Sequence, residues 1–215
     1  MGHVCQRLVG CASRAARGFT VLELLIAMSL MAVVITASGA AFSATFKAWT
    51  AGRKIADEQQ NARLVLEWMS RRVRLAGVGT LPAGQAAYFT EAAGGSMAFF
   101  ADVNSDGVAE VHRFCLDATT GVVREQVVAL PPAPSTCTAG SPITSRGIRP
   151  LRIAALGLGY FEGTEDTLTP LPLAGIDLAR VKRVQIVLAL DSNQSGAFEA
   201  GSDITFRMDA IVRNF

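Results

Sequence analysis

An acidic segment in the middle of the chain has the residue types and spacing of an oxygen-rich cation site. Asp102, Asn104, Asp106 and Glu110 occur in the pattern D-x-N-x-D-G-x-x-E. Calcium takes carboxylate and amide oxygens at alternate positions of a tight loop. The segment is not an EF-hand, because Arg113 stands at the twelfth position, where that loop needs a bidentate glutamate. The same residues suit a turn between two strands, so calcium and a plain turn are both open.

The rest of the sequence contains no pattern typical of catalysis. G-x-S-x-G, H-E-x-x-H, phosphate-loop and dinucleotide patterns are all missing from the chain. Serine or aspartate without a base and an orienting partner does not make a nucleophile. His112 is expected to be a surface or packing residue on a strand. We therefore predict no enzyme activity, and no cofactor apart from the calcium ion considered above.

The strongest pattern is an uncharged run near the N-terminus. Residues 24–46 contain no Asp, Glu, Lys or Arg, and a helix of that length crosses the apolar core of a bilayer. The alternative is a buried core helix, but such helices seldom run so long without a polar face. Arg7, Arg14 and Arg17 precede the run. This charge bias favours a cytoplasmic N-terminus and a translocated remainder.

The order of polar and apolar residues here differs from that of an ordinary secretory signal, which is cleaved after its apolar stretch. The polar leader ends at Gly18 and the apolar stretch begins at Phe19, so cleavage at this junction leaves the helix in the mature protein. Glu23 is the one acid at the head of the stretch. A carboxylate there is costly unless it is paired or reaches the interface, and both alternatives are open.

Residues 18–27, GFTVLELLIA, resemble the processing site of type IV prepilins and of type II secretion pseudopilins. The resemblance implies that a prepilin peptidase cuts after Gly18 and methylates the new N-terminus at Phe19. It also implies that Glu23 neutralises the N-terminal amine of a neighbouring subunit, a pairing in which two desolvated charges compensate each other. The implied partners are prepilin peptidase, the inner membrane, and other pilins or pseudopilins through the N-terminal helix.

Two further segments are similar to PilW-type minor pilins. They are NAR at 61–63 leading to RVRLAG at 72–77, and the acidic turn followed by an aromatic-containing strand. J-type pseudopilins share much of this pattern. The resemblance implies a structural minor pilin, assembled into or at the tip of a type IV pilus and periplasmic before assembly. A type II secretion pseudopilin and a filament-tip adhesin or DNA-binding module are the alternatives.

Nucleic acid is not an expected partner. Without residues 1–18 the chain has 17 Lys and Arg against 18 Asp and Glu, so the body offers no general attraction for phosphate. Arg71, Arg72 and Arg74 form a basic cluster in the predicted last turn of a helix. Cations are favoured there by the helix dipole, and no aromatic residues interleave with them to stack on bases. We interpret the cluster as a solvated helix end.

Which cysteines remain in the mature protein depends on the cleavage that the resemblance implies. Cys5 and Cys11 are lost with the leader, which leaves Cys115 and Cys137. A domain in an oxidising compartment favours a disulfide between them, and free buried thiols are the alternative. The bond would tie a Pro-rich loop, residues 131–148, to a strand.

One long helix and a β-rich domain must position these residues. Half of the 215 residues are hydrophobic and 18% are charged, which excludes a disordered or fibrous chain. After residue 46 the helical pattern becomes amphipathic, and Gly77, Gly79 and Pro82 end it. Runs rich in Val, Ile, Leu and Phe, separated by turn residues, then predict strands at 97–101, 110–116, 122–130, 149–158, 181–190 and 204–212.

A helix packed on an antiparallel sheet is an α+β arrangement, and the resemblance implies the same layout as the pilin fold. The predicted organisation is a leader at 1–18, a transmembrane or filament-core helix half at 19–46, an amphipathic helix half at 47–79, and a globular β-rich domain at 80–215.

Overall fold

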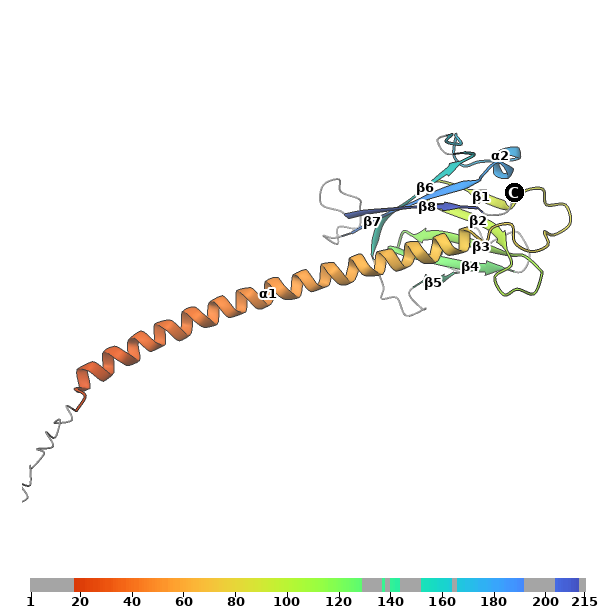
Figure 1. The fold of residues 1–215 in the computed structure, drawn as a ribbon. Helices are drawn as coiled ribbons and strands as arrows, with labels where there is room; N and C mark the ends of the chain where they lie inside the picture. The colour runs from red at the N-terminus through yellow and green to blue at the C-terminus, as the bar shows by residue number, and fades with distance from the viewer. Residues whose placement is uncertain are drawn as a thin grey trace, which may run out of the picture. The chain divides into compact units, whose positions relative to one another are not determined.

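The structure is a computed structural model that describes residues 18–128, 137, 140–143, 152–163, 166–191 and 204–212. Most of the predicted leader and most of the predicted loop 131–148 lie outside these residues. The chain divides into two compact units, Met1–Gly52 and Arg53–Phe215. Each unit is described by itself below (Figure 1).

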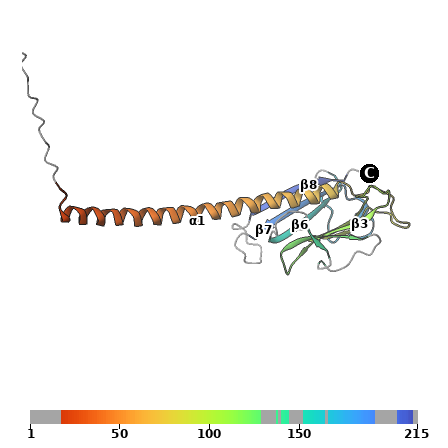
Figure 2. The same cartoon turned by 90° about the horizontal axis from the view of Figure 1, so that it is seen from below.

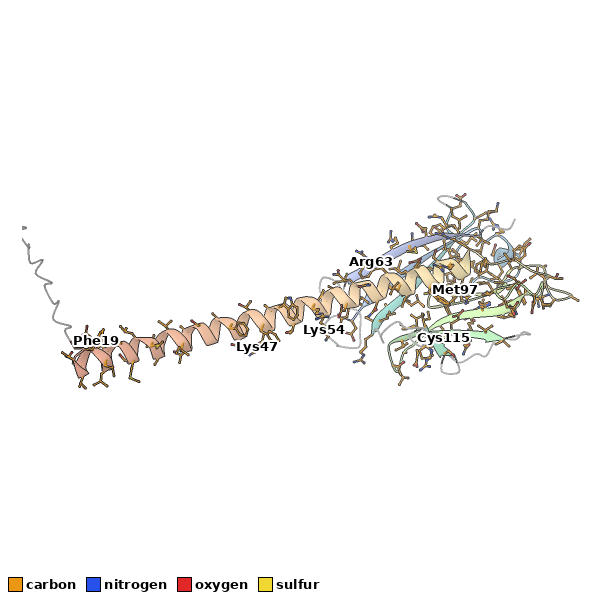
Figure 3. All side chains as sticks on the ribbon, turned by 60° about the horizontal axis from the view of Figure 1, so that its bottom comes forward. Phe19, Lys47, Lys54, Arg63, Met97 and Cys115 are labelled. Atoms are coloured by element: carbon orange, nitrogen blue, oxygen red, sulfur yellow. A yellow bond between two sulfur atoms is a disulfide. The ribbon has the colours of Figure 1, made fainter. Side chains whose placement is uncertain are left out.

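Helix α1, Val21–Val73, runs through 53 residues without a break. Thr20 begins it, because its Oγ1 accepts the backbone N–H of Glu23 at 3.2 Å and so caps a free donor of the first turn. Between Gly18 and Gly52 every residue is exposed, and Figure 3 draws the side chains of this stretch as sticks, with Phe19 and Lys47 labelled. Among the described residues, α1 is the one helix long and apolar enough to cross a membrane.

The hydroxyl groups of the serines and threonines in the apolar half form hydrogen bonds within the helix itself. Ser29, Thr36 and Ser43 donate to backbone carbonyl oxygens three or four residues earlier in the helix, at 2.8–3.0 Å. Thr45 and Thr50 do the same. Polar groups that are bonded within their own helix can enter an apolar environment at low cost. These hydroxyls therefore do not oppose membrane insertion.

The second unit contains the end of α1, two antiparallel sheets and the short helix α2, Ile176–Ala179. The five strands of the first sheet follow chain order and are β1 Phe89–Ala92, β2 Ser96–Ala101, β3 Glu110–Asp117, β4 Val122–Val128 and β5 Ser141–Pro142. The second sheet consists of β6 Ile153–Phe161, β7 Arg183–Leu190 and β8 Ile204–Ile211. Figure 2 shows these strands beside β3.

This architecture confirms the predicted α+β class and the six predicted strands, to within a few residues at their described ends. The sequence pattern did not predict β1, β5 or α2. It also did not show that the strands divide into two sheets, a division that depends on contacts between distant residues.

The hydrophobic core of the second unit lies between the end of α1 and the two sheets. One face of α1, with Ala62, Leu66, Met69 and Val73, is buried against side chains from both sheets. Tyr160 of β6 is fully buried, and its hydroxyl lies 3.0 and 3.2 Å from the carbonyl oxygens of Ala93 and Ser96 at the β1–β2 turn. Burial and the nearby charge of Glu91 raise the pKa of Tyr160. The phenol therefore stays protonated and links the two sheets.

Two glycines carry the chain from α1 into the first sheet. Gly77 and Gly79 have φ angles of 85° and 94°, which side chains with a Cβ rarely adopt. Gly77 N–H donates to the carbonyl oxygen of Phe100 at 2.9 Å, and Asp102 N–H donates to that of Val78 at 2.8 Å. The end of the helix is thereby bonded to β2 and to the start of the acidic turn.

Candidate functional site

The acidic turn joins β2 to β3 and is held by its own side chains. The carboxylate of Asp102 accepts the backbone N–H groups of Ser105 at 2.6 Å and of Gly107 at 2.8 Å. The Nδ2 of Asn104 donates to Asp106 Oδ2 at 2.9 Å and to Glu110 Oε1 at 2.7 Å. The structure thus brings the four predicted residues into one hydrogen-bonded loop.

The calcium site at this turn stays a prediction. Within the described ranges, no group of three or more His, Cys, Asp and Glu side chains is arranged to hold a metal ion. An amide nitrogen of Asn104, not an oxygen, faces Asp106 and Glu110. Calcium binding would therefore require the Asn104 amide to turn round and the carboxylates to draw together.

A buried carboxylate on β4 forms a second polar cluster, which sequence reasoning missed. Glu125 is 4% exposed and accepts from Trp68 Nε1 at 3.0 Å. Its Oε1 also lies 3.2 Å from His112 Nδ1 and 3.4 Å from Arg72 Nε. The guanidinium of Arg72 lies over the Trp68 ring, 4.6 Å from its centroid. We call Trp68, Arg72, His112 and Glu125 the Glu125 cluster.

The prediction that Arg72 belongs to a solvated helix end is wrong. Its side chain is 13% exposed and pairs with Glu125, whereas Arg71 is exposed and pairs with Glu67 along the helix. The physical reason is the helical period, which places Arg72 one turn after Trp68 on the side that faces the sheet. His112 is buried and stacks on Phe99 with ring centroids 6.1 Å apart, as expected of a packing residue.

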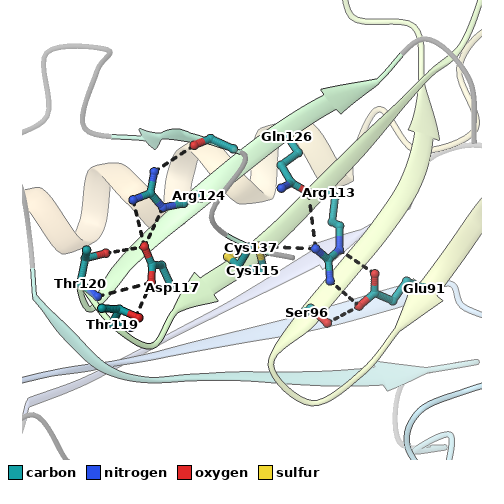
Figure 4. Close-up of a disulfide and its surroundings, with 11 residues drawn as sticks. Glu91, Ser96, Arg113, Cys115, Asp117, Thr119, Thr120, Arg124, Gln126 and Cys137 are labelled. Carbon is teal, nitrogen blue, oxygen red and sulfur yellow. Dashed lines mark hydrogen bonds and ion pairs between the residues drawn. A yellow bond between two sulfur atoms is a disulfide. The ribbon is translucent and has the colours of Figure 1, made fainter. Parts of the chain in front are cut away.

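The disulfide between Cys115 and Cys137 is present, with Cα atoms 5.8 Å apart. Two ion pairs lie on either side of it (Figure 4). On one side Arg113 Nε donates to Glu91 Oε2 at 2.7 Å, and on the other Arg124 Nε donates to Asp117 Oδ2 at 2.9 Å.

The two carboxylates of these ion pairs favour their charged forms. Burial alone would raise the pKa of Glu91, but hydrogen bonds from Arg113 and Ser96 and the charge of Arg113 bring that pKa below its ordinary value. A hydrogen bond from the Thr120 hydroxyl does most to lower the pKa of Asp117, together with backbone N–H groups and Arg124. Both side chains are structural anchors of the first sheet.

The N-terminal junction is accessible in the structure. Gly18 and Phe19 precede α1 and belong to no helix or strand, and Phe19 is 80% exposed. Glu23 lies in the first turn of α1 and is exposed. Among the residues that the structure describes, no cation pairs with the Glu23 carboxylate. The acid at the head of the apolar helix is therefore available to a partner outside the chain.

Residues 13–39 match the family model of the prokaryotic N-terminal methylation motif. The chain carries a pilin-type methylation motif. No curated protein and no solved structure gave a match to the chain. The matched residues include Gly18, Phe19 and Glu23 and the first half of the apolar run.

The methylation motif supports a type IV pilin-like or pseudopilin protein, and it suggests a structural subunit rather than an enzyme. It implies processing by prepilin peptidase and assembly with other pilins. Together with the apolar half of α1, it also suggests anchoring in a membrane.

An aromatic ladder marks the end of the apolar half of α1. The rings of Phe42 and Phe46 stack with centroids 6.5 Å apart, and those of Phe46 and Trp49 lie 6.1 Å apart. Lys47 is the first charged residue after the uncharged run. Aromatic and basic side chains gather where a transmembrane helix leaves the hydrocarbon region, so this ladder marks the end of the apolar segment.

Proposed function

We propose that this protein is a minor pilin, cut after Gly18 and methylated at Phe19, and assembled into or at the tip of a type IV pilus. Before assembly, the apolar half of α1 anchors it in the inner membrane with the β-rich unit in the periplasm. The observation that carries this proposal is a methylation motif on a helix half whose described residues, Gly18 to Gly52, are all exposed.

Such a helix needs an apolar environment, because exposed apolar surface of this extent is unfavourable in water. Lipid supplies that environment before assembly, and the helices of other subunits supply it in a filament. The Glu23 carboxylate, which has no ion-pair partner among the described residues, fits the second setting. Buried among helices it is costly alone, whereas an N-terminal amine from a neighbouring subunit compensates it and fixes the axial register.

The first experiment is intact mass spectrometry of the protein from membranes of a host that expresses prepilin peptidase. The expected chain begins at Phe19 and carries one N-methyl group. A chain that begins at Met1 in the presence of active peptidase contradicts the proposal.

The second experiment compares Glu23→Ala with Glu67→Ala, which removes an exposed acid from the same helix. Both variants should be inserted and processed, because neither alters the cleavage site. Incorporation of Glu23→Ala into sheared filaments should fall well below that of the native protein, whereas Glu67→Ala should be incorporated normally. Equal incorporation of both variants would mean that Glu23 is only an interfacial carboxylate.

A minor pseudopilin of type II secretion is the second candidate, because residues 18–27 are similar to the processing sites of both classes. Cross-linking of the membrane protein, followed by identification of its neighbours, distinguishes the two. Recovery of secretion-system subunits in place of pilus subunits would assign the chain to the pseudopilins.

A further inference from the structure

Strand β8, Ile204–Ile211, is the outer strand of the second sheet, and its free edge is long and regular. All eight of its residues pair with β7, without a shift of register. Proteins usually protect a free edge by a bulge, a proline, a short strand or an inward charge. Strand β8 has none of these, because it contains no proline and its partly buried and buried residues are apolar.

The other edge strands are protected. Strands β1 and β5 have only four and two residues. The pairing of β6 is irregular between Ile153 and Ala155, and its Leu158 N–H already donates to the carbonyl oxygen of Gly94 at 2.8 Å. Within the part of the chain that the structure describes, β8 is therefore the edge most open to pairing with a further strand.

The backbone groups at the open edge belong to alternate residues of β8. Val212 N–H donates to the carbonyl oxygen of Lys182 at 2.9 Å, so residue 212 faces β7. Successive residues of an antiparallel strand present their backbone groups to opposite edges. The four residues that face the open edge, all with exposed side chains, are therefore Thr205, Arg207, Asp209 and Ile211.

The charges at these positions are self-complementary. Arg207 has no ion pair among the described residues, and Asp209 Oδ1 lies 3.4 Å from Arg183 Nη1 and 3.2 Å from Gln185 Nε2. A second copy of β8, antiparallel and related by a two-fold axis at Met208, would place Arg207 of each copy opposite Asp209 of the other. Opposite charges at directly facing positions stabilise a strand pair.

The neighbouring registers are unfavourable. The backbone hydrogen bonds require residues of the open edge to face one another, so the register can change only in steps of two. One step in one direction places Arg207 opposite Arg207, and one step in the other places Asp209 opposite Asp209. Like charges at facing positions destabilise a strand pair. One register therefore matches both the hydrogen bonds and the charges.

We propose that β8 pairs with β8 of a second copy of this chain, antiparallel and centred on Met208, so that the second sheets of the two copies become one continuous sheet. Thr205 of each copy then faces Ile211 of the other. Such a two-fold pairing closes at two copies. It uses no residue of α1 and does not depend on the proposed pilin function.

The test is sedimentation velocity of the full chain in density-matched detergent, with Cys5→Ser and Cys11→Ser to remove the thiols outside the disulfide. The native chain should form a reversible dimer. Because of the two-fold axis each substitution alters two facing pairs, so Arg207→Glu and Asp209→Lys should each weaken the dimer by roughly tenfold or more. Arg63→Glu, which reverses an exposed cation on α1, is the matched control and should associate like the native chain.

The decisive sample is an equimolar mixture of Arg207→Glu and Asp209→Lys, in which opposite charges face each other again at both places. The mixture should associate about as tightly as the native chain. Asp209→Lys also loses the contacts with Arg183 and Gln185. If it does not fold, Arg207→Glu combined with Asp209→Asn replaces the mixture, and it should associate more tightly than Arg207→Glu because the like-charge pair is gone.

Three results would overturn the proposal. The first is a native chain that stays monomeric at every concentration. The second is a set of charge variants that associate as tightly as the native chain, which would assign the association to another surface. The third is a mixture, or the replacement double variant, that associates no better than Arg207→Glu alone.

Discussion

Glu125 shows at the scale of one residue how the end of α1 is fixed to the first sheet. Its carboxylate is bonded to Trp68 and Arg72 of the helix and to His112 of β3. A buried charge is tolerated only when partners replace the water that it has lost. These three donors do so, and two of them come from α1, far from Glu125 in the sequence.

Glu125→Gln should therefore destabilise the second unit. The amide keeps the shape of the side chain but loses the charge that the three donors require, so the free energy of unfolding should fall by about 2 to 4 kcal/mol. Urea unfolding followed by circular dichroism measures the change. The matched control is Glu67→Gln, which removes an exposed pair with Arg71 and should cost less than about 1 kcal/mol. Equal losses would contradict a structural role for Glu125.

Glu91 should make part of the stability depend on pH. Its pKa in the folded state lies below the ordinary value of 4.5, so the stabilisation is present above that pH and is lost as pH falls through the lowered pKa. The native protein should exceed Glu91→Gln in unfolding free energy near neutral pH. The difference should shrink in acid below pH 4.5. A difference that is constant with pH would show that the charge of Glu91 contributes nothing.

The Glu125 cluster could not be predicted from the sequence. Trp68 and Glu125 are 57 residues apart, and a periodic pattern reports only which face of an element is apolar. A weak signal did exist, because Trp68 and Arg72 lie four residues apart on one helix face. Gly18, Phe19 and Glu23 were easier to select, since they lie within one contiguous stretch of characteristic order.

At the scale of elements, the connection from α1 to β2 depends on glycines. A Cβ on Gly79 would lie 2.7 Å from the Cβ of Asp102, in a backbone of φ +94°. Gly84 has a similar φ of +89° but nothing within 4 Å of such a Cβ. The two positions therefore separate the cost of the conformation from the cost of the close contact.

Gly84→Ala should cost about 1 to 3 kcal/mol through its backbone conformation alone. Gly79→Ala should cost clearly more, because Asp102 must move and the acidic turn with it. Thermal unfolding of the two variants gives the comparison. If Gly79→Ala is no worse than Gly84→Ala, the contact between Gly79 and Asp102 is not a constraint on the turn.

The disulfide should stabilise the second unit by linking β3 to a residue 22 positions further along the chain. In the chain-entropy model a loop of this size is worth about 3 kcal/mol. Replacement of Cys115 and Cys137 by Ala should lower the free energy of unfolding by that amount. Thiol counting on denatured, unreduced mature protein should find none. Two reactive thiols in envelope-purified protein would contradict the bond.

The regular elements were predictable wherever their patterns were long. An uncharged run and six strands of alternating or apolar residues leave a local signal, and α1 with β2, β3, β4, β6, β7 and β8 followed it. Strands β1 and β5, of four and two residues, are too short to show a period. Their pairing with β2 and β4 depends on neighbours that only the folded chain brings together.

At the scale of the whole molecule, the second unit has a hydrophobic core of its own, whereas the described residues of the first unit are exposed. The buried residues of α1 begin at Ala62, so the core of the second unit needs nothing before Arg53. The described residues of the first unit, Gly18 to Gly52, are all exposed.

A protein of residues 53–215 should therefore fold and stay in solution without detergent, whereas the full chain should require it. Size-exclusion chromatography and circular dichroism of both forms provide the measurement. Aggregation of the shorter form, with loss of its β signal, would show that the N-terminal half contributes to the fold.

The positions of Trp49 and Trp68 give the protein two independent optical reporters. The chain has two tryptophans, one in the exposed aromatic ladder and one beneath Arg72 with its indole N–H on Glu125. In Trp68→Phe, emission should shift to the blue when lipid vesicles are added. In Trp49→Phe, emission should not change when vesicles are added. It should shift to the red only when denaturant unfolds the second unit. The direction of the emission shift then distinguishes membrane insertion from unfolding, each reported by its own single-tryptophan variant.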